Sequence, residues 1–437
     1  MQILTRLVTT MLVWAMLALP AAARGLIRDA DVEYALKQIA APILRAAGLP
    51  SSTRIIVIND SSLNAFVADN QHIFLHSGLI MKLKSAPALQ YVIAHEASHI
   101  SNGHIARRTG NARAASTAAG LGIIIATAAA AASGNAGAGA GVAIGLQSSA
   151  LRNFLAHSRA EESSADISAL RAMVRAGIDP KAAIEVHDIF RGQEALSVGR
   201  QDPYMRSHPL TRDRLRAAQA FVAGNKVKTQ SDPAAQYWFA RAQGKLSAFL
   251  RAPSWTLRRA NASATKDIAL MRQAIAHHRS SNLKKALQAM DGALSLRPRD
   301  AFYMELKGQI LLENRQFSNA AQVYRAANRL APSEPLILGG LGRAELASGN
   351  PRAALNSLEK ARARDFRDPR ILRDLAVANA KLGNNGMASL LTAERYALLG
   401  KAKDARLHAT RAEALLPRGS GPWRRAQDVL SATKNLR

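Results

Sequence analysis

The chain has 437 residues, of which 48% are hydrophobic and 21% charged, as in a globular protein of two or three domains. It contains no cysteine, so we expect neither disulfides nor a lipid attached to an N-terminal cysteine. Its formal net charge is +28, from 59 basic and 31 acidic residues, which indicates contacts with anionic surfaces or acidic protein patches.

The N-terminal segment, 1–23, is predicted to be a signal peptide. Arg6 precedes an apolar run from Leu7 to Leu19, and a proline and three alanines follow. The run is short for a membrane span, and the small residues suit cleavage after Ala23. A permanent N-terminal membrane anchor is the alternative. Export without cysteine indicates the bacterial periplasm, so we expect no nucleic-acid partner and allow peripheral contact with an anionic membrane.

Two short segments, 53–60 and 72–76, are predicted strands. Both are rich in β-branched and large apolar residues, and the second alternates between polar and apolar positions. A helix is then predicted to begin near Ser85, because a serine followed by a proline in the first turn is a typical helix start.

The predicted helix after Ser85 carries the sequence His95-Glu96-Ala-Ser-His99. Residues four apart lie one turn apart on the same helix face, so His95 and His99 can bind one zinc ion. Glu96 beside them can accept a proton from a metal-bound water. The alternative is a polar helix face without metal. His104 would lie about 140° off that face if the helix continued, so we expect it to be a helix-end or supporting residue, not a ligand.

A third zinc ligand is expected on a second helix, predicted over residues 151–176. Glu162 and Asp166 are four apart and share one face of this helix, whereas Glu161 points about 100° away. One carboxylate can bind zinc while the other accepts the second ring N–H of a ligand histidine. Spacing alone does not distinguish this arrangement from a solvated acidic patch.

The two motifs together resemble the HtpX–BepA family of gluzincin zinc metallopeptidases, in its periplasmic BepA-like branch. That family pairs H-E-x-x-H with a distant E-x-x-A-D, which residues 162–166 match. The segments 62–80 and 207–215 also resemble it. The resemblance implies that His95, His99 and Glu162 bind one Zn²⁺. It also implies that Glu96 activates water and that Asp166 orients a ligand histidine.

The same resemblance implies an α+β, mostly α protease domain with a small β-sheet beside the zinc site. Such a strand pairs with an extended substrate. The resemblance also brings His208, in a Ser-His-Pro element, near the metal. There His208 would either donate a hydrogen bond to the oxyanion or occupy the open zinc position. A lone histidine before a proline is otherwise typical of a structural helix entrance.

The segment from Ala114 to Ala132 has no charge and about the length of a membrane span. It consists mostly of alanine and glycine, so we expect a helical pair that covers the active-site cleft. A membrane-embedded metalloprotease that uses this segment as a span is the alternative.

The C-terminal half is predicted to be an α-solenoid of tetratricopeptide repeats. Alanines recur with a constant step of about 34 residues, the period of these paired helices, at Ala286, Ala320 and Ala354. Ala293, Ala327 and Ala361 repeat the same step. We therefore divide the chain into a signal peptide (1–23), a zinc metalloprotease domain (24–230) and a repeat domain (231–437).

The predicted function is that of a periplasmic zinc-dependent endopeptidase. Resemblance to the BepA-like branch implies that it degrades misassembled outer-membrane β-barrel proteins, and that its repeats contact those proteins and their assembly machinery. A periplasmic chaperone or scaffold with residual proteolysis is the alternative from another class.

Overall fold

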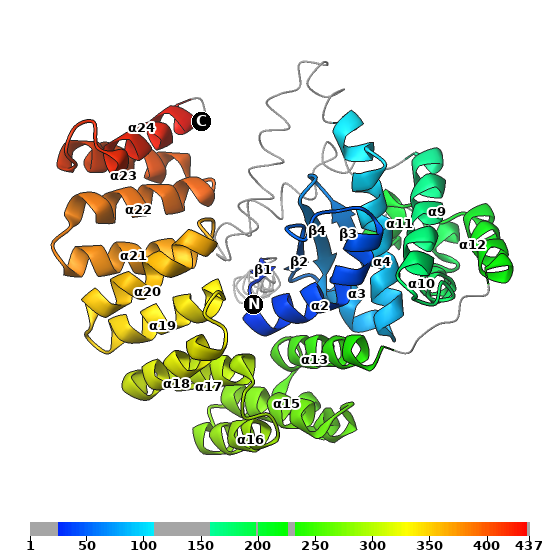
Figure 1. Ribbon diagram of the computed structural model, residues 1–437, viewed down its shortest axis with the longest axis horizontal. Helices are drawn as coiled ribbons and strands as arrows, with labels where there is room; N and C mark the ends of the chain where they lie inside the picture. Colours follow the sequence, from blue (N-terminus) through cyan, green and yellow to red (C-terminus); the bar gives the residue numbers. More distant parts are fainter. Residues whose placement is uncertain (1–24, 109–157, 198–199, 226–231, 435–437) are drawn as a thin grey trace, which may run out of the picture.

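The computed structural model describes residues 25–108, 158–197, 200–225 and 232–434. A lobe of helices around a small sheet is followed by a curved stack of paired helices (Figure 1). The predicted signal peptide, 1–23, and the predicted cleft cover, Ala114 to Ala132, lie outside the described residues. Among those described, no helix combines the length and the apolar character needed to cross a membrane.

The small sheet has four strands in the order β1-β2-β4-β3. β2 and β4 run parallel, with Ile56 opposite Phe74, while β1 and β3 pair antiparallel with their neighbours. The predicted strands at 53–60 and 72–76 are confirmed. The strands are β1 (Leu26–Ile27), β2 (Arg54–Ile58), β3 (Ala65–Val67) and β4 (His72–His76).

Helices cover this sheet and build the rest of the lobe. They are α2 (Ala30–Ala46), α3 (Ser77–Lys82), α4 (Ala86–Ser101), α9 (Arg159–Arg175), α10 (Ala182–Phe190), α11 (Pro203–Ser207) and α12 (Arg212–Gly224), with a 3-10 turn at Gln193–Ala195. α4 begins as predicted: the Ser85 side chain accepts a hydrogen bond from the backbone N–H of Ala88. All but one of its residues from Ala86 to His99 are buried, so neighbours surround this helix on every side.

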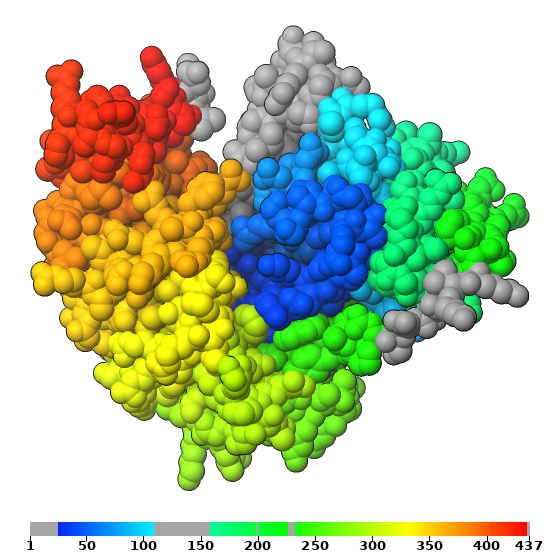
Figure 2. All heavy atoms as spheres, viewed as in Figure 1, coloured from blue at the N-terminus to red at the C-terminus, as the bar shows by residue number. Residues whose placement is uncertain are grey.

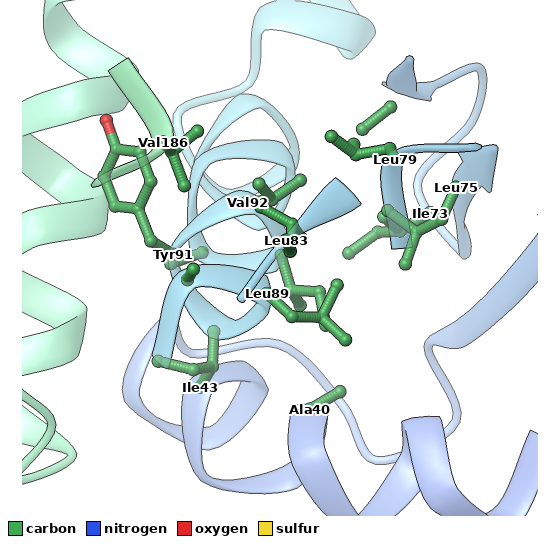
Figure 3. Close-up of a cluster of buried hydrophobic side chains, with 14 of the residues drawn as sticks. Ala40, Ile43, Ile73, Leu75, Leu79, Leu83, Leu89, Tyr91, Val92 and Val186 are labelled. Atoms are coloured by element: carbon green, nitrogen blue, oxygen red, sulfur yellow. The ribbon is translucent and has the colours of Figure 1, made fainter. Parts of the chain in front are cut away.

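Figure 3 shows the core around α4, in which Leu89 and Val92 lie close to Leu83 of the preceding loop. Tyr91 points the other way, toward Val186 of α10. Apolar contacts therefore hold α4 on both sides and fix the direction in which its polar side chains point.

The helix that carries Glu162 is shorter than predicted. It begins at Arg159, because Ser158 is extended and accepts a hydrogen bond from the backbone N–H of Glu161. The Glu161 carboxylate in turn accepts one from the backbone N–H of Ser158. This reciprocal capping box starts α9 at Arg159, while residues 151–157 of the predicted helix lie outside the described residues. The C-terminal end is as predicted, at Arg175, and Gly177 follows with φ +71°.

The second half is a stack of antiparallel helix pairs. It comprises α13 (Pro233–Leu250), α14 (Pro253–Arg259), a 3-10 turn (Ala260–Ala262), α15 (Lys266–Arg279), α16 (Leu283–Leu296), α17 (Ala301–Glu313), α18 (Phe317–Leu330), α19 (Pro335–Ala347), α20 (Pro351–Arg364), α21 (Pro369–Lys381), α22 (Asn385–Leu398), α23 (Ala402–Leu415) and α24 (Gly421–Thr433). The predicted repeat is confirmed, since the starts of α16, α18 and α20 are separated by the same step as the recurring alanines. All six recurring alanines are fully buried, where small side chains let helices cross closely.

The helix α13 belongs to both halves. Its Ala235, Phe239 and Leu246 lie in the core of the first lobe, where α13 packs along α2. On its other side α13 packs against α15, ahead of the regular repeats. The predicted boundary between residues 230 and 231 stays a prediction, and the two halves share a buried interface across it.

The start of the first lobe is inserted against the inner face of the repeats. Arg28 Nη2 lies 2.7 Å from Asp365 Oδ2, and Nη1 lies 3.4 Å from Asp368 Oδ2. Arg241 of α13 is fully buried and pairs with Asp31 of α2 at 2.8 Å. Figure 2 shows the N-terminal part seated against the middle repeats. The repeats are therefore tied to the protease lobe by buried charges as well as by α13.

Candidate metal centre and active site

The helix α4 delivers the first two candidate ligands. His95 and His99 are both fully buried, and their Nε2 atoms lie 3.1 Å apart. Two imidazoles one helical turn apart can approach this closely only if both point to the same side of the helix, as the spacing predicted.

Glu162 comes from α9, which packs along α4. Its Oε1 lies 3.3 Å from His99 Nε2, and its Oε2 lies 3.5 Å from His95 Nε2. The helix pair therefore brings Glu162 next to the two histidines although it lies far from them in the sequence. Glu161, in contrast, pairs with Arg108 at 2.9 Å and lies outside this group.

His208 completes the group from the end of the short helix α11. Its Nδ1 lies 3.3 Å from His95 Nε2 and 2.9 Å from Glu162 Oε1. Its backbone N–H donates to the Tyr204 carbonyl at 2.7 Å, and the two rings pack with centroids 4.7 Å apart. The sequence-predicted approach of His208 to the other three residues is therefore seen.

The spacing of these four residues fits one small cation. One ligand atom from each of His95, His99, Glu162 and His208 lies within 4.8 Å of the others, and all four side chains are buried. Zinc bonds of about 2.0–2.1 Å in a tetrahedron place neighbouring ligand atoms about 3.3 Å apart. The separations between 2.9 and 3.5 Å match that edge. Imidazole and carboxylate donors of this kind bind divalent metal ions.

Asp166, one turn after Glu162, lies behind the first histidine. Its Oδ1 is 2.9 Å from His95 Nδ1 and also accepts a hydrogen bond from the Tyr91 hydroxyl at 3.0 Å. This contact favours the proton on Nδ1 and leaves Nε2 with its lone pair toward the cluster. Burial opposes the charge of Asp166, but the Arg214 charge and hydrogen bonds outweigh it and hold its pKa far below the ordinary value.

Sequence reasoning missed Arg214, which ties the two carboxylates together. Its Nε and Nη2 donate to Asp166 at 2.6 and 2.8 Å, and its Nη1 lies 2.8 Å from Glu162 Oε2. Arg214 lies in the first turn of α12, shortly after His208 and within the segment that resembled the protease family. No local sequence pattern shows that this arginine is buried against two carboxylates, so the sequence alone could not assign it to the site.

His104 lies behind the cluster. α4 ends at Ser101, and Gly103 adopts φ +72°, so the chain turns and brings His104 Nδ1 to 2.9 Å from His99 Nδ1. The ring therefore contacts the side of His99 that faces away from Glu162. Its place is compatible with the supporting role that we predict for it.

Glu96 lies at the wall of the cluster, and neither of its carboxylate oxygens has a hydrogen-bond partner among the described residues. Its Oε1 is 3.5 Å from His208 Nε2. Full burial raises the pKa of Glu96 above its ordinary value. A carboxylate of this kind holds a proton more readily than an exposed one, which suits a group that takes a proton and passes it on.

The cluster also favours positive charge where a metal would sit. Burial opposes protonation of His95, but hydrogen bonds to Asp166 and Glu162 outweigh it and raise its pKa to about 10. Glu162 is likewise held ionised: burial opposes its charge, but His208 and further hydrogen bonds keep its pKa well below the ordinary value. A metal ion and protons therefore compete for the same atoms, and metal affinity falls as the pH is lowered.

A helix-borne His-Glu-x-x-His pair facing a carboxylate from a second helix defines a metallopeptidase site. Comparison with known proteins agrees. Residues 28–222 match the family described as Peptidase family M48, and residues 271–335 and 311–378 match tetratricopeptide repeat families. The chain thus has an M48 metallopeptidase domain followed by tetratricopeptide repeats, which confirms the predicted resemblance.

Several relatives share this organisation. The chain is 24% identical over 374 residues to the Beta-barrel assembly-enhancing protease of Escherichia coli (strain K12). The aligned segment covers 83% of this chain and 74% of that protein. The protein of that name from Yersinia pestis is 25% identical over 359 residues, or 80% of this chain and 72% of its own length. The Mitochondrial metalloendopeptidase OMA1 of Schizosaccharomyces pombe is 28% identical over 178 residues, or 40% of this chain and 48% of that protein.

Proposed function

We propose that this metallopeptidase is a zinc endopeptidase in which His95, His99 and Glu162 hold the metal. The observation that supports the proposal most strongly is the buried group of two imidazole nitrogens and one carboxylate, brought together from α4 and α9 at tetrahedral spacing. Arg214 and Asp166 support the group from behind and keep the ligand atoms in place.

Zinc, when bound, polarises the scissile carbonyl and lowers the pKa of a water molecule. Glu96 accepts the proton of that water and later delivers it to the leaving amine, since the described part of the chain engages neither of its oxygens in a hydrogen bond. The Asp166 carboxylate, 2.9 Å from His95 Nδ1, favours the proton on that nitrogen and so keeps the ring in the tautomer that binds metal.

The substrate is an extended polypeptide that adds to the sheet at β3. β3 is the last strand in the sheet order, and its flanking residue Leu63 accepts a hydrogen bond from the Tyr204 N–H of α11 at 3.2 Å. The edge therefore lies beside the helix that carries His208. Backbone pairing at such an edge gives affinity with little sequence demand. Phe66 is buried against Phe74, so it belongs to the core of the sheet and not to the cleft.

We propose that the natural substrates are outer-membrane β-barrel proteins in the periplasm, and that the repeats hold these proteins or their assembly machinery. The proposal draws on the name of the relatives from Escherichia coli and Yersinia pestis, and on the predicted signal peptide. Concave repeat surfaces bind partners and raise the local substrate concentration at a nearby site.

Metal analysis combined with a protease assay tests the proposed chemistry. The purified chain without residues 1–23 should contain about one zinc per molecule and cleave casein. Removal of the metal with a chelator should stop cleavage, and added zinc should restore it. Unchanged cleavage after complete metal removal would contradict the proposal, and a zinc-bound protein that never cleaves polypeptides would favour a scaffold.

Replacing His208 by alanine tests its place in the cluster. Because its Nδ1 lies among the candidate ligand atoms, we propose that His208 closes the fourth zinc position, so the variant should cleave casein faster. His277→Ala, in the distant helix α15, is the matched control and should cleave at the original rate. A fall of about 10²-fold would instead assign His208 to oxyanion stabilisation. An unchanged rate would leave it a structural role only.

A further inference from the structure

A large cavity lies where the protease lobe meets the first helices of the second half. Its volume is about 800 Å³, within the range of sites for small ligands and peptide segments. Its walls come from the end of α3 and the following loop, from α13 and α14, and from the start of α15. It is separate from the candidate metal centre, whose residues do not line it.

The described lining of this cavity is basic and aromatic. Lys84, Arg251 and Arg272 line it, and no described aspartate or glutamate does. The Arg251 guanidinium lies 5.7 Å from the centre of the Trp255 ring, which also lines the cavity. None of the three cations forms an ion pair with a described carboxylate, so their charge is not balanced within the cavity.

A second cavity, at the inner face of the repeats, differs from the basic cavity in the charges that line it. That cavity, of about 380 Å³, is lined by four acidic and four basic residues: Asp29, Glu305, Glu313, Asp368, Arg28, Lys245, Arg343 and Arg370. Arg28 there faces Asp368 at 3.4 Å, and Lys245 faces Asp29 at 2.8 Å. The charges lining this smaller cavity are therefore balanced, whereas those lining the basic cavity are not.

Arg272 is the central observation. Arg272 is buried, with only 8% of its surface exposed. Its Nη1 donates to Ser263 Oγ at 2.7 Å and to the Arg259 carbonyl at 3.1 Å, but its Nε has no hydrogen-bond partner in the described ranges of the chain. Burial lowers the pKa of Arg272, and no carboxylate offsets that effect. Other buried arginines, such as Arg214 and Arg241, have two carboxylate partners each.

Burying a guanidinium without a counter-ion costs free energy. A bound anion would supply the missing negative charge and offset that cost. A carboxylate matches the fork of the guanidinium with two hydrogen bonds. The apolar walls, which include Met81, Tyr237 and Ile268, suit the side chain beside that carboxylate. A polypeptide is favoured over a lipid because Met81 and Lys84 of the lining belong to the peptidase domain, whose substrates are polypeptides, and the other lining residues lie between that domain and the tetratricopeptide repeats or at the start of those repeats.

We propose that this basic cavity binds the C-terminal carboxylate of a polypeptide, with Arg272 as its anchor. The site would hold one end of a substrate or partner chain at the junction between the protease lobe and the repeats. It extends the proposed function by adding a second contact for the same polypeptide.

The test measures binding without cleavage. A fluorescent peptide that ends in tryptophan, with either a free carboxylate or an amide, is titrated with the full chain carrying Glu96→Gln. The free carboxylate should bind at least about 10-fold more tightly than the amide, as expected for hydrogen bonds between charged groups. Arg272→Gln should remove this difference. Arg418→Gln, at an exposed arginine in the loop before α24, changes the net charge equally and should keep it.

Circular dichroism of each variant checks that the helices are intact, and Arg272→Lys, which retains the charge, should keep part of the preference. Equal binding of the two peptides, or the same preference in Arg272→Gln, would overturn the proposal. Vesicles of phosphatidylglycerol provide the other arm. Vesicle binding that depends on Arg272, without any preference for the peptide carboxylate, would assign the cavity to lipid phosphate and also overturn the proposal. Since no cleavage is measured, failure here leaves the proposed zinc chemistry untouched.

Discussion

Replacing Glu96 by glutamine should lower polypeptide cleavage by about 10²- to 10⁴-fold while leaving the bound zinc in place. Glutamine has nearly the same shape, so the buried site around it stays packed, but it cannot accept the proton of the attacking water. Glu96 is not among the four residues whose ligand atoms cluster, so metal content should be unchanged.

Zinc content and the rate of casein cleavage, measured on the same preparation, check this expectation. Glu161→Gln is the matched control. It removes one nearby carboxylate charge, but glutamine also serves at this position of a capping box, so both zinc and activity should persist. Loss of zinc in Glu96→Gln would show that Glu96 contacts the metal, and unchanged cleavage would remove it from the reaction.

Replacing Glu162 by alanine should remove both the metal and the activity. Glu162 supplies the only carboxylate of the four-residue cluster, and its loss leaves the positive charge of Arg214 pointing at a site meant for a cation. Three imidazoles remain if His208 keeps the fourth position, but without the carboxylate the buried guanidinium of Arg214 faces the cation and opposes its binding. We expect zinc content to fall from about one per chain to near zero.

Zinc analysis after gel filtration in zinc-free buffer measures the effect. The comparison is Glu161→Ala, one position earlier on the same helix, which should lose some helix stability through the broken cap but keep its zinc. Retention of zinc in Glu162→Ala would mean that His208 completes the site in its place, since its Nδ1 lies within the same group of atoms.

The two histidines could be predicted from the sequence because their spacing lies within one helix and depends on nothing distant. The spacing of Glu162 and Asp166 is equally compatible with a solvated acidic patch, so the prediction of Glu162 as a ligand depends on the family resemblance. Arg214 and Tyr91 escaped prediction because only the packing of three helices brings them to Asp166. No local pattern encodes such a meeting.

The start of α9 is predictable in principle, and the prediction of a longer helix is wrong. Ser158 and Glu161 have the spacing of a capping box, and this local signal outweighs the apolar periodicity that suggests a helix from residue 151. The repeats are predicted well, since their period is written several times over in the sequence. Their contact with the N-terminal segment is not, because it joins side chains that lie far apart along the chain.

The ion pair between Arg28 and Asp365 spans 337 positions of the chain. Arg28 emerges early in synthesis, and its partners on the loop before α21 emerge only after most of the chain has been made. Contacts between such distant positions slow folding, whereas each helix pair of the repeats can form from its neighbours alone. We therefore expect the segment around Arg28 to reach its final place late in folding, after the repeats that carry Asp365 have formed.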